Sequence, residues 1–204
     1  DYLKNSPVWE ENKEVIQEMD KDVVKLRMVT ERFSSIGSKP VIQSENVFSV
    51  VDDAITYLRP RISSKVEMNV NGYAKDIEAM INKPLFEWVI ENICKNAVDA
   101  MKGQGKIAID IIKESEQYVI VDISDTGKGM EKKMFKRVFN PGFSTRKRGW
   151  GLGLTLAKRI IEGYHQGKVF VKQSEIGKGT TFRIILKGVK EQMEENTKDN
   201  FFSF

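Results

Sequence analysis

The chain has 204 residues, of which 40% are hydrophobic and 30% are charged, so it can bury a sizeable core. No apolar run approaches the length that spans a bilayer and no basic-then-apolar leader opens the chain, so we expect neither a membrane span nor a signal peptide. The single cysteine, Cys94, excludes an internal disulfide, and its apolar helical surroundings indicate packing rather than chemistry. A start at Asp1 rather than at Met indicates a fragment of a longer protein.

The first predicted element is a long helix from Val8 to Ile36. Its apolar residues recur at alternating four- and three-residue spacing, with polar breaks at Asn12 and Asp22. A heptad seam of this kind is typical of a helix bundle or a dimer interface. Packing of the helix on its own domain is the alternative.

Beyond residue 40, strands and helices follow one another without regular alternation. Helices are predicted over 47–61, 83–101 and 152–162, the first capped by Asn46 or Ser44 and the second by Asn82. Strands are predicted at 41–42, 65–70, 77–81, 106–113, 117–124, 168–174 and 180–187, with turns at 71–72 and 177–179. This order predicts an α/β (α+β) fold, a two-layer sandwich with a mixed sheet and helices on one face.

A basic loop lies between the strand at 117–124 and the helix at 152–162. Residues 128–148 hold eight Lys and Arg residues and one acid, Glu131, whereas the net charge of the whole chain is only +4. Loops of this length in compact domains are usually functional or disordered, and the glycines at both ends would act as hinges. The pattern predicts a lid that clamps a polyanion. The charge does not follow a helix face, which argues against nucleic acid.

Three groups of residues are candidates for chemistry. Asn92, Asn96 and Asp99 lie at i, i+4 and i+7 on one helix face, where an amide oxygen could assist Mg²⁺ binding, although a solvated polar stripe is the alternative. Asp125 ends a strand and could accept an amino hydrogen from a purine, although its sequence is also a turn signature. The glycines from 149 to 153 could bring backbone N–H groups to phosphate oxygens at a helix start, or simply form a tight turn.

These groups occur in a characteristic order: Asn92 and Asn96, then Asp125-Thr126-Gly127-Lys128-Gly129, Phe139, Gly149-Trp150-Gly151-Leu152-Gly153-Leu154, and Gly177-Lys178-Gly179-Thr180-Thr181-Phe182. The order resembles the nucleotide-binding boxes of the GHKL superfamily over about residues 41–187. Within it, the chain looks most like the catalytic domain of a bacterial sensor histidine kinase of the nitrogen-regulation type. The helix at 8–36 then resembles the second helix of the dimerisation and phosphoacceptor hairpin.

The resemblance implies ATP and Mg²⁺ as cofactors. It implies that Asn96 coordinates Mg²⁺, that Asn92 contacts the phosphates or the waters of the metal, and that Asp125 binds the adenine amino group. Lys147 and Arg148 would reach the terminal phosphate. The other nucleotide-binding residues that it implies are Asp99, Gly127, Gly129, Met130, Phe139, Gly149, Gly151, Leu152, Gly153, Leu154 and Thr180.

The implied function is transfer of the γ-phosphate of ATP to a histidine upstream of Asp1, followed by relay to an aspartate in a response regulator receiver domain. The only histidine of the chain, His165, is interpreted as structural. Hydrolysing members of the superfamily carry a water-activating glutamate where Asn92 stands, which favours transfer over hydrolysis. An ATP-binding or dimerising module without kinase activity, or another GHKL protein kinase, is the alternative.

The implied organisation has three parts: a partial dimerisation region at 1–38, an ATP-binding kinase domain at 41–187 and a charged tail at 188–204. A homodimer would form through the N-terminal helix within the full hairpin. We expect a cytoplasmic location for this segment, no nucleic acid partner, and membrane contact only through segments outside it, with the parent anchored in the inner membrane.

Overall fold

The computed structural model describes residues 15–16, 40–72, 76–144 and 151–189. The chain divides into two units, Asp1–Pro40 and Val41–Phe204. In the first unit, Val15 and Ile16 are helical, and the rest of the predicted helix at 8–36 lies outside the described residues. The heptad seam and its proposed dimer interface therefore stay predictions.

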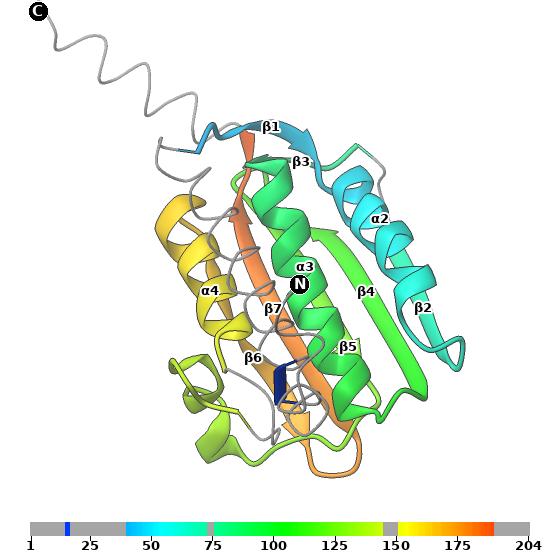
Figure 1. The fold of residues 1–204 in the computed structure, drawn as a ribbon. Coiled ribbons are helices and arrows are strands. Elements are labelled where there is room, and N and C mark those ends of the chain that lie inside the picture. The colour runs from blue at the N-terminus through cyan, green and yellow to red at the C-terminus, as the bar shows by residue number, and fades with distance from the viewer. Residues whose placement is uncertain (1–14, 17–39, 73–75, 145–150, 190–204) are drawn as a thin grey trace, which may run out of the picture. The chain divides into compact units, whose positions relative to one another are not determined.

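The second unit is built on a five-stranded sheet with the strand order β2-β4-β5-β7-β6 (Figure 1). β2 (Val66–Gly72) runs parallel to β4 (Gly105–Lys113), and β4 runs antiparallel to β5 (Tyr118–Asp125). β7 (Gly179–Lys187) lies between β5 and β6 (Lys168–Glu175) and is antiparallel to both. The sheet is mixed, as the sequence predicted.

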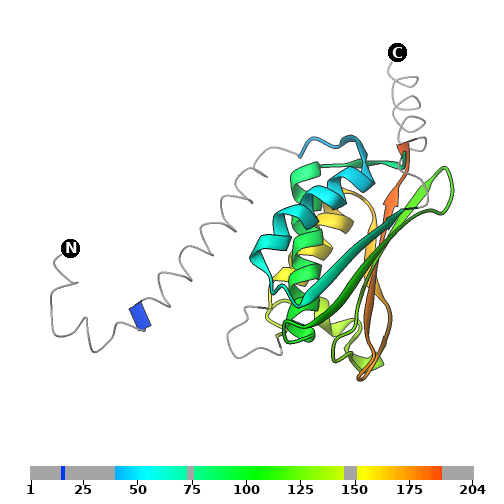
Figure 2. The same cartoon turned by 90° about the vertical axis from the view of Figure 1, so that its right-hand side faces the viewer.

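Three α-helices among the described residues of the second unit lie on one face of this sheet (Figures 1 and 2). They are α2 (Val47–Leu58), α3 (Lys83–Ala100) and α4 (Gly153–Arg159). A π-helical turn, Ile160–Tyr164, directly follows α4. Ile107 and Ile109 of β4 are completely buried beneath them, because alternate residues of a strand point to opposite faces of the sheet. The two-layer arrangement predicted from the sequence is confirmed.

Short elements complete the unit. β1 (Gln43–Asn46) and β3 (Glu78–Ile81) form a separate antiparallel pair beside the main sheet. Residues Arg59–Arg61, Lys132–Met134 and Arg137–Phe139 form 3-10 turns. No helix among the described residues has both the length and the apolar content needed to cross a bilayer.

Helix caps and apolar faces follow the sequence closely. The Asn46 side chain accepts a hydrogen bond from the Ser49 N–H at 2.8 Å and caps α2, and Asn82 caps α3 in the same way. The predicted apolar face of α2 is buried along its whole length: Val47, Val50, Val51, Ala54, Ile55 and Leu58. Cys94 is also buried, and burial raises the pKa of its thiol to about 12, so the predicted packing role is confirmed.

Some boundaries differ from the prediction. Asn71 and Gly72, predicted as a turn, belong to β2, where they pair with Asp110 and Ile111 of β4. The Asn71 side chain also donates to the Asp110 carboxylate at 3.0 Å, so a cross-strand contact extends the strand through a turn-forming sequence. The first strand begins at Gln43, where its pairing with β3 starts, and not at residue 41 as predicted.

His165 connects two distant parts of the fold. Its Nε2 accepts a hydrogen bond from the Asn82 N–H at 3.0 Å, so Nδ1 carries the proton and donates to the Ile160 carbonyl oxygen, also at 3.0 Å. The ring thereby ties the start of α3 to the end of α4. Burial lowers the pKa of His165, against the opposing effect of the two hydrogen bonds. This bridge confirms the structural role predicted from the sequence.

His165 should make the stability of the domain depend on pH. Because its folded-state pKa lies below the usual 6.5, protonation favours the unfolded chain. We expect the contribution of His165 to the free energy of unfolding to be fully present above pH 6.5. It should decrease as the pH drops from there toward the lowered pKa of His165. His165→Phe should cost about 1–3 kcal/mol at pH 7.5, because the Asn82 N–H and Ile160 carbonyl lose their partner.

Urea unfolding at several pH values between 5 and 8 measures both effects. His165 is the only histidine, so the variant should lose most of the pH dependence in this window. An equal pH dependence in the variant and the original protein would contradict this role.

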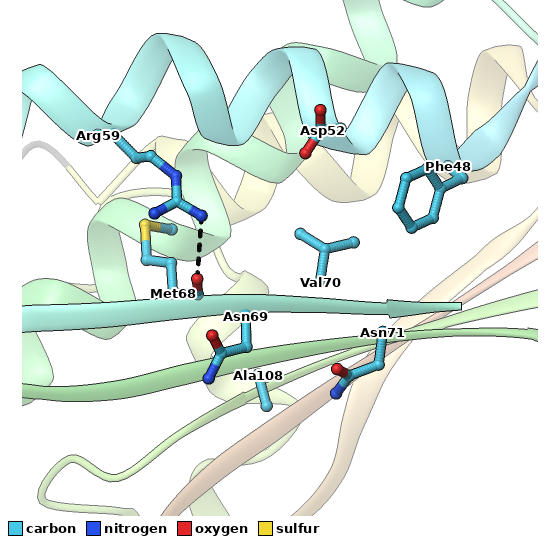
Figure 3. A pocket seen from close by; sticks show the side chains of 8 residues that line it. All are labelled: Phe48, Asp52, Arg59, Met68, Asn69, Val70, Asn71 and Ala108. Carbon is cyan, nitrogen blue, oxygen red and sulfur yellow. Dashed lines mark hydrogen bonds between the residues drawn. The ribbon is translucent and has the colours of Figure 1, made fainter. Parts of the chain in front are cut away.

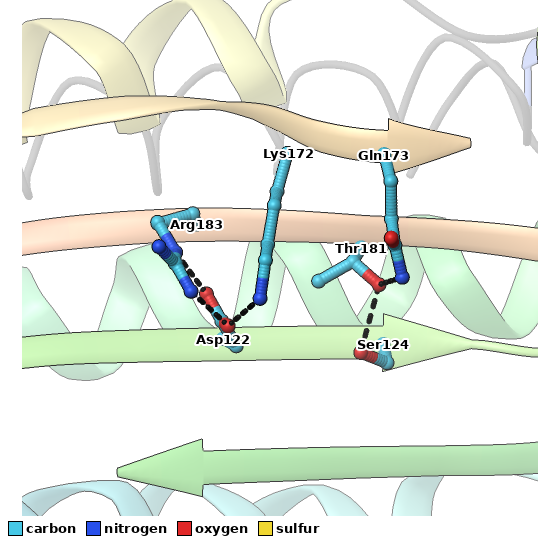
Figure 4. Close-up of polar contacts among 6 residues, drawn as sticks. All are labelled: Asp122, Ser124, Lys172, Gln173, Thr181 and Arg183. Atoms are coloured by element: carbon cyan, nitrogen blue, oxygen red, sulfur yellow. Dashed lines mark hydrogen bonds and ion pairs between the residues drawn. The ribbon is translucent and has the colours of Figure 1, made fainter. Parts of the chain in front are cut away.

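The outer face of the sheet carries an ion cluster around one buried carboxylate (Figure 4). Asp122 of β5 is only 3% exposed, and its carboxylate accepts two hydrogen bonds from Arg183 at 2.7 Å and one from Lys172 at 2.8 Å. Burial alone would raise the pKa of Asp122, but the hydrogen bonds from the two cations outweigh burial and lower it. The cluster therefore joins β5, β6 and β7 through one ionised carboxylate.

Removing this charge should destabilise the sheet. We expect Asp122→Asn to cost about 1–2 kcal/mol at pH 7, because Arg183 and Lys172 lose their shared anion while staying partly solvated. The lowered pKa means that the stabilisation is present above the ordinary carboxyl pKa and is lost as the pH falls through the folded-state value.

Asp110 provides the matched control, since it is the cross-strand neighbour of Asp122 on the same face. Thermal unfolding at pH 7 should show a much smaller loss for Asp110→Asn than for Asp122→Asn. Equal losses of stability in the two variants would mean that Arg183 and Lys172 do not stabilise the Asp122 carboxylate.

Candidate functional site

Asp125 occupies the end of β5 on the face that the helices cover. The residue is 8% exposed, and its Oδ1 accepts a hydrogen bond from the Gly127 N–H at 2.7 Å. Burial raises the pKa of this carboxyl, and backbone hydrogen bonds from Gly127 and then Thr180 oppose the shift. Two backbone donors, one in the loop after β5 and one in β7, thus hold one carboxyl group in a fixed orientation.

The segment after Asp125 is held against two neighbours. The Lys128 N–H donates to the Ala100 carbonyl at the end of α3, and the Gly177 N–H donates to the Lys128 carbonyl at 2.8 Å. Gly129 has a φ of +65°, and a Cβ there would overlap the carbonyl oxygen of Glu175. Only glycine permits this contact, so its position in the sequence reflects close packing of the segment on the turn between β6 and β7.

Ser174 closes this part of the site, and the sequence did not indicate it. Its hydroxyl accepts from the Met130 N–H at 2.8 Å, donates to the Gly179 carbonyl at 2.9 Å, and lies 2.9 Å from the Thr180 hydroxyl. Thr180 is the cross-strand partner of Asp125. The predicted residues Asp125, Gly127, Gly129, Met130 and Thr180 are therefore brought together at one end of the sheet.

The polar residues of α3 form the second part of the site. Asn92 and Asn96 are half-buried, whereas Asp99 is exposed. The Asn92 amide nitrogen donates to the Trp88 carbonyl at 2.8 Å. The amide oxygen approaches Gly153, where a Cβ would lie 2.9 Å from it. Asn92 thus connects α3 to the start of α4.

Glu91 adjoins Asn92 in sequence but takes part in a different contact. Its carboxylate is buried and pairs with Lys95 at 2.7 Å, one turn further along α3. One residue corresponds to a rotation of about 100° around a helix. The carboxylate of Glu91 is therefore engaged with a neighbour on its own helix, while the Asn92 amide reaches α4.

The start of α4 has features that suit an anionic ligand. No side chain in the described part of the chain caps this helix, whose N-cap residue is Leu152.

Gly151 packs directly on the backbone of Gly142 and Phe143. Thr155, which the sequence did not indicate, donates from its hydroxyl to the Phe139 carbonyl at 3.0 Å and so joins α4 to the preceding segment. Leu152 and Leu154 are half-buried.

The basic segment differs from the single open loop that the sequence predicted. Two 3-10 turns, Lys132–Met134 and Arg137–Phe139, lie within it, and Val138 and Phe139 are buried among the charged residues. The Phe139 ring packs edge-on against Phe182 of β7, with 6.2 Å between the ring centroids. Phe139 is therefore an anchor of this segment. The predicted residues Lys147, Arg148 and Gly149 lie outside the described residues, and so does Trp150.

A metal would have to draw on few protein ligands here. The part of the chain that the structure describes contains no group of three or more His, Cys, Asp or Glu residues suited to a metal ion. Mg²⁺ commonly takes one or two protein oxygens together with phosphate oxygens and waters, so amide oxygens such as those of α3 are compatible with it.

A separate hollow lies beside α2 and β2, at the β2 edge of the sheet (Figure 3). It has a volume of about 400 Å³ and is lined by residues of α2 and β2, with Arg59 and Ala108 beside them. The Arg59 guanidinium donates to the outward-facing Met68 carbonyl of β2 at 3.1 Å. None of the predicted site residues lines this hollow, so we assign the chemistry to the region between α3, α4 and the end of β5.

Known proteins provide an independent comparison. Residues 82–190 match the family described as histidine kinase-, DNA gyrase B-, and HSP90-like ATPase. The chain is 35% identical to sporulation kinase E of Bacillus subtilis (strain 168) over 159 residues, which are 77% of this chain and 21% of that protein. It is 28% identical to the sensor histidine kinase ZraS of Salmonella typhimurium over 200 residues, covering 95% of this chain and 42% of ZraS.

The chain thus spans less than half the length of these curated relatives. Among solved structures, a complex of the histidine kinase ThkA with the response regulator protein TrrA shares the fold, with a TM-score of 0.70 and 19% identity. The similarity covers 92% of this chain and 54% of the ThkA chain. The expected GHKL-type fold is confirmed.

The family match begins at the cap of α3, continues through Asp125 and α4, and extends past the end of β7, so it contains both parts of the site. It also takes in more than half of the chain. This chain belongs to the histidine kinase-, DNA gyrase B-, and HSP90-like ATPase family.

Proposed function

We propose that this chain is the ATP-binding catalytic domain of a sensor histidine kinase, an enzyme that transfers the γ-phosphate of ATP to a histidine outside these residues. The observation that carries the proposal is the buried Asp125 carboxyl at the end of β5, held by backbone donors beside the glycine-rich segment 127–130. The names of the curated relatives, sporulation kinase E and sensor histidine kinase ZraS, support a kinase.

In this proposal, Asp125 selects the base. A buried carboxylate oxygen accepts the amino hydrogen of adenine, and Gly127 and Gly129 leave room for the ring. Gly129 holds the segment close to the turn between β6 and β7, and Thr180 lies across from Asp125 on β7. Met130 would border the base through the loop that Ser174 fixes.

The phosphates would lie between α3 and α4. Asn96 would bind Mg²⁺ through its amide oxygen, and Asn92, whose oxygen faces Gly153, would contact the phosphates or the waters of the metal. The bound metal supplies charge stabilisation to the transferring phosphoryl group. Backbone amides from Gly149 to Leu154 would hold phosphate oxygens, and Lys147 and Arg148 would approach the terminal phosphate. Asp99, exposed at the end of α3, would act at longer range.

The partners follow from the same proposal. The phosphorylated histidine would pass its phosphoryl group to the receiver domain of a response regulator, and a similar partnership is named for ThkA and TrrA. A homodimer would form through the helix predicted at 8–36. The site would face the cytoplasm, with any membrane anchor in segments outside these residues.

Nucleotide binding should depend on the Asp125 carboxylate. We expect Asp125→Asn to weaken ATP binding about tenfold to a hundredfold, because an amide in this position presents a donor or a weaker acceptor to the adenine amino group. Isothermal titration calorimetry with Mg-ATP on the 204-residue chain measures the change.

One control variant and one pH profile make this test specific. Asp110→Asn removes a carboxylate from the opposite face of the same sheet and should leave ATP binding unchanged. The pKa of Asp125 is raised, and the carboxyl becomes protonated as the pH falls through this raised pKa. The affinity of the original protein for ATP should therefore decline over the same pH range. Undiminished binding by Asp125→Asn would overturn the proposed base site.

Phosphoryl transfer should depend on Asn96. We expect the chain, mixed with the upstream segment of its parent and γ-labelled ATP with Mg²⁺, to place an acid-labile, alkali-stable label on a histidine of that segment. Asn96→Ala should lower labelling on the order of a hundredfold, because the metal contributes several kcal/mol of charge stabilisation. Asn69→Ala, an exposed asparagine of β2, is the matched control.

The outcomes of this experiment separate the candidate functions. A labelled histidine supports the kinase. ATP binding without any label favours a regulatory ATP-binding module, and a labelled serine favours another protein kinase of the superfamily. Failure to bind ATP with Mg²⁺ would exclude all three.

A further inference from the structure

The contacts of Ser174 fix the direction of a neighbouring hydroxyl group. Ser174 lies near the end of β6, and its Oγ contacts the Met130 N–H, the Gly179 carbonyl oxygen and the Thr180 Oγ1, at 2.8, 2.9 and 2.9 Å. These contacts come from the loop after β5, from the start of β7 and from the residue across from Asp125. A single hydroxyl of β6 thus joins the loop after β5 to the start of β7.

Counting protons assigns each of these hydrogen bonds a direction. A serine hydroxyl has one hydrogen to donate and two lone pairs that accept. The Met130 N–H can only donate and the Gly179 carbonyl can only accept, so they use one lone pair and the hydrogen of Ser174. All three contacts are satisfied only if the Thr180 O–H donates to the remaining lone pair of Ser174. The Thr180 oxygen then has no hydrogen left for a ligand.

We propose that Ser174 is a positioning residue for base selection: by accepting the hydrogen bond of the Thr180 O–H, it leaves the Thr180 oxygen only as an acceptor, beside the acceptor Asp125. This inference rests on the proposed ATP site. Two acceptors, the Asp125 carboxylate and the Thr180 oxygen, can each receive one of the two hydrogens of the adenine 6-amino group, whereas a 6-oxo group has no hydrogen for either of them. Ser174 itself would not touch the nucleotide.

The other face of the sheet contains a matched pair. Ser124 Oγ and Thr181 Oγ1 are 2.9 Å apart, the same separation as Ser174 and Thr180, and Thr181 follows Thr180 in β7 (Figure 4). Because successive strand residues point to opposite faces, this pair faces away from the proposed site. Ser124→Ala therefore removes a similar hydroxyl bridge without altering the base pocket.

The test compares the affinities of ATP and inosine triphosphate, which carries a 6-oxo group, for the 204-residue chain with Mg²⁺. We expect the original protein to prefer ATP. In Ser174→Ala the Thr180 O–H is released to donate, so the preference for ATP over inosine triphosphate should fall about fivefold to tenfold, the size of one hydrogen bond. Ser124→Ala should keep the original preference, and Ser174→Thr, which retains a hydroxyl, should restore it.

Each result has a defined meaning. An equal loss of affinity for both nucleotides in Ser174→Ala would show a merely structural role and overturn the proposal. Should that variant fail to fold, Ser174→Cys conserves the volume with a weak hydrogen-bonding group, and an unchanged preference in it would overturn the proposal as well. If the original protein did not bind ATP, the underlying function would be refuted. If it bound ATP tightly and Ser174→Ala kept the same preference for ATP, only the role of Ser174 would be refuted.

Discussion

The attachment of residues 127–130 to the turn between β6 and β7 is the constraint on which the rest of the site depends. Lys128 is bonded on one side to the end of α3 and on the other to Gly177, while Gly129 meets the Glu175 carbonyl without a side chain between them. These contacts leave the Asp125 carboxyl enclosed by backbone donors rather than exposed to water. A larger residue at position 129 would separate the loop from the turn.

β5 serves stability and binding at once, because its residues alternate between two environments. Asp122 points to the outer face, where Arg183 and Lys172 lower its pKa and keep it ionised. Asp125, three residues later, points to the helices, where burial raises its pKa. The same residue type therefore acts as a structural anion on one face and as a candidate ligand acceptor on the other, and the pleat of the strand separates the two roles.

The two parts of the candidate site depend on α3. Its start is fixed by the Asn82 cap and by the His165 bridge, and its end holds the loop after β5 through the Ala100 carbonyl. Asn92 lies between these anchors and reaches the start of α4. A phosphate or metal ligand on this helix would thus be placed relative to the base pocket by rigid backbone contacts, which suits a reaction that requires mainly positioning.

The sequence by itself determined the helix caps, the buried face of α2, the hairpin strands and the order of the glycine-rich segments, because these features depend on local periodicity and on residues near in the chain. It could not determine that Asn71 and Gly72 remain in β2, that Phe139 anchors the basic segment on Phe182, or that Ser174 joins Met130 to Thr180. Each of these depends on a partner dozens of residues away or on the direction of one hydroxyl proton. Only the tertiary structure brings such groups within hydrogen-bonding or van der Waals distance, and so only it decides which of them form the site.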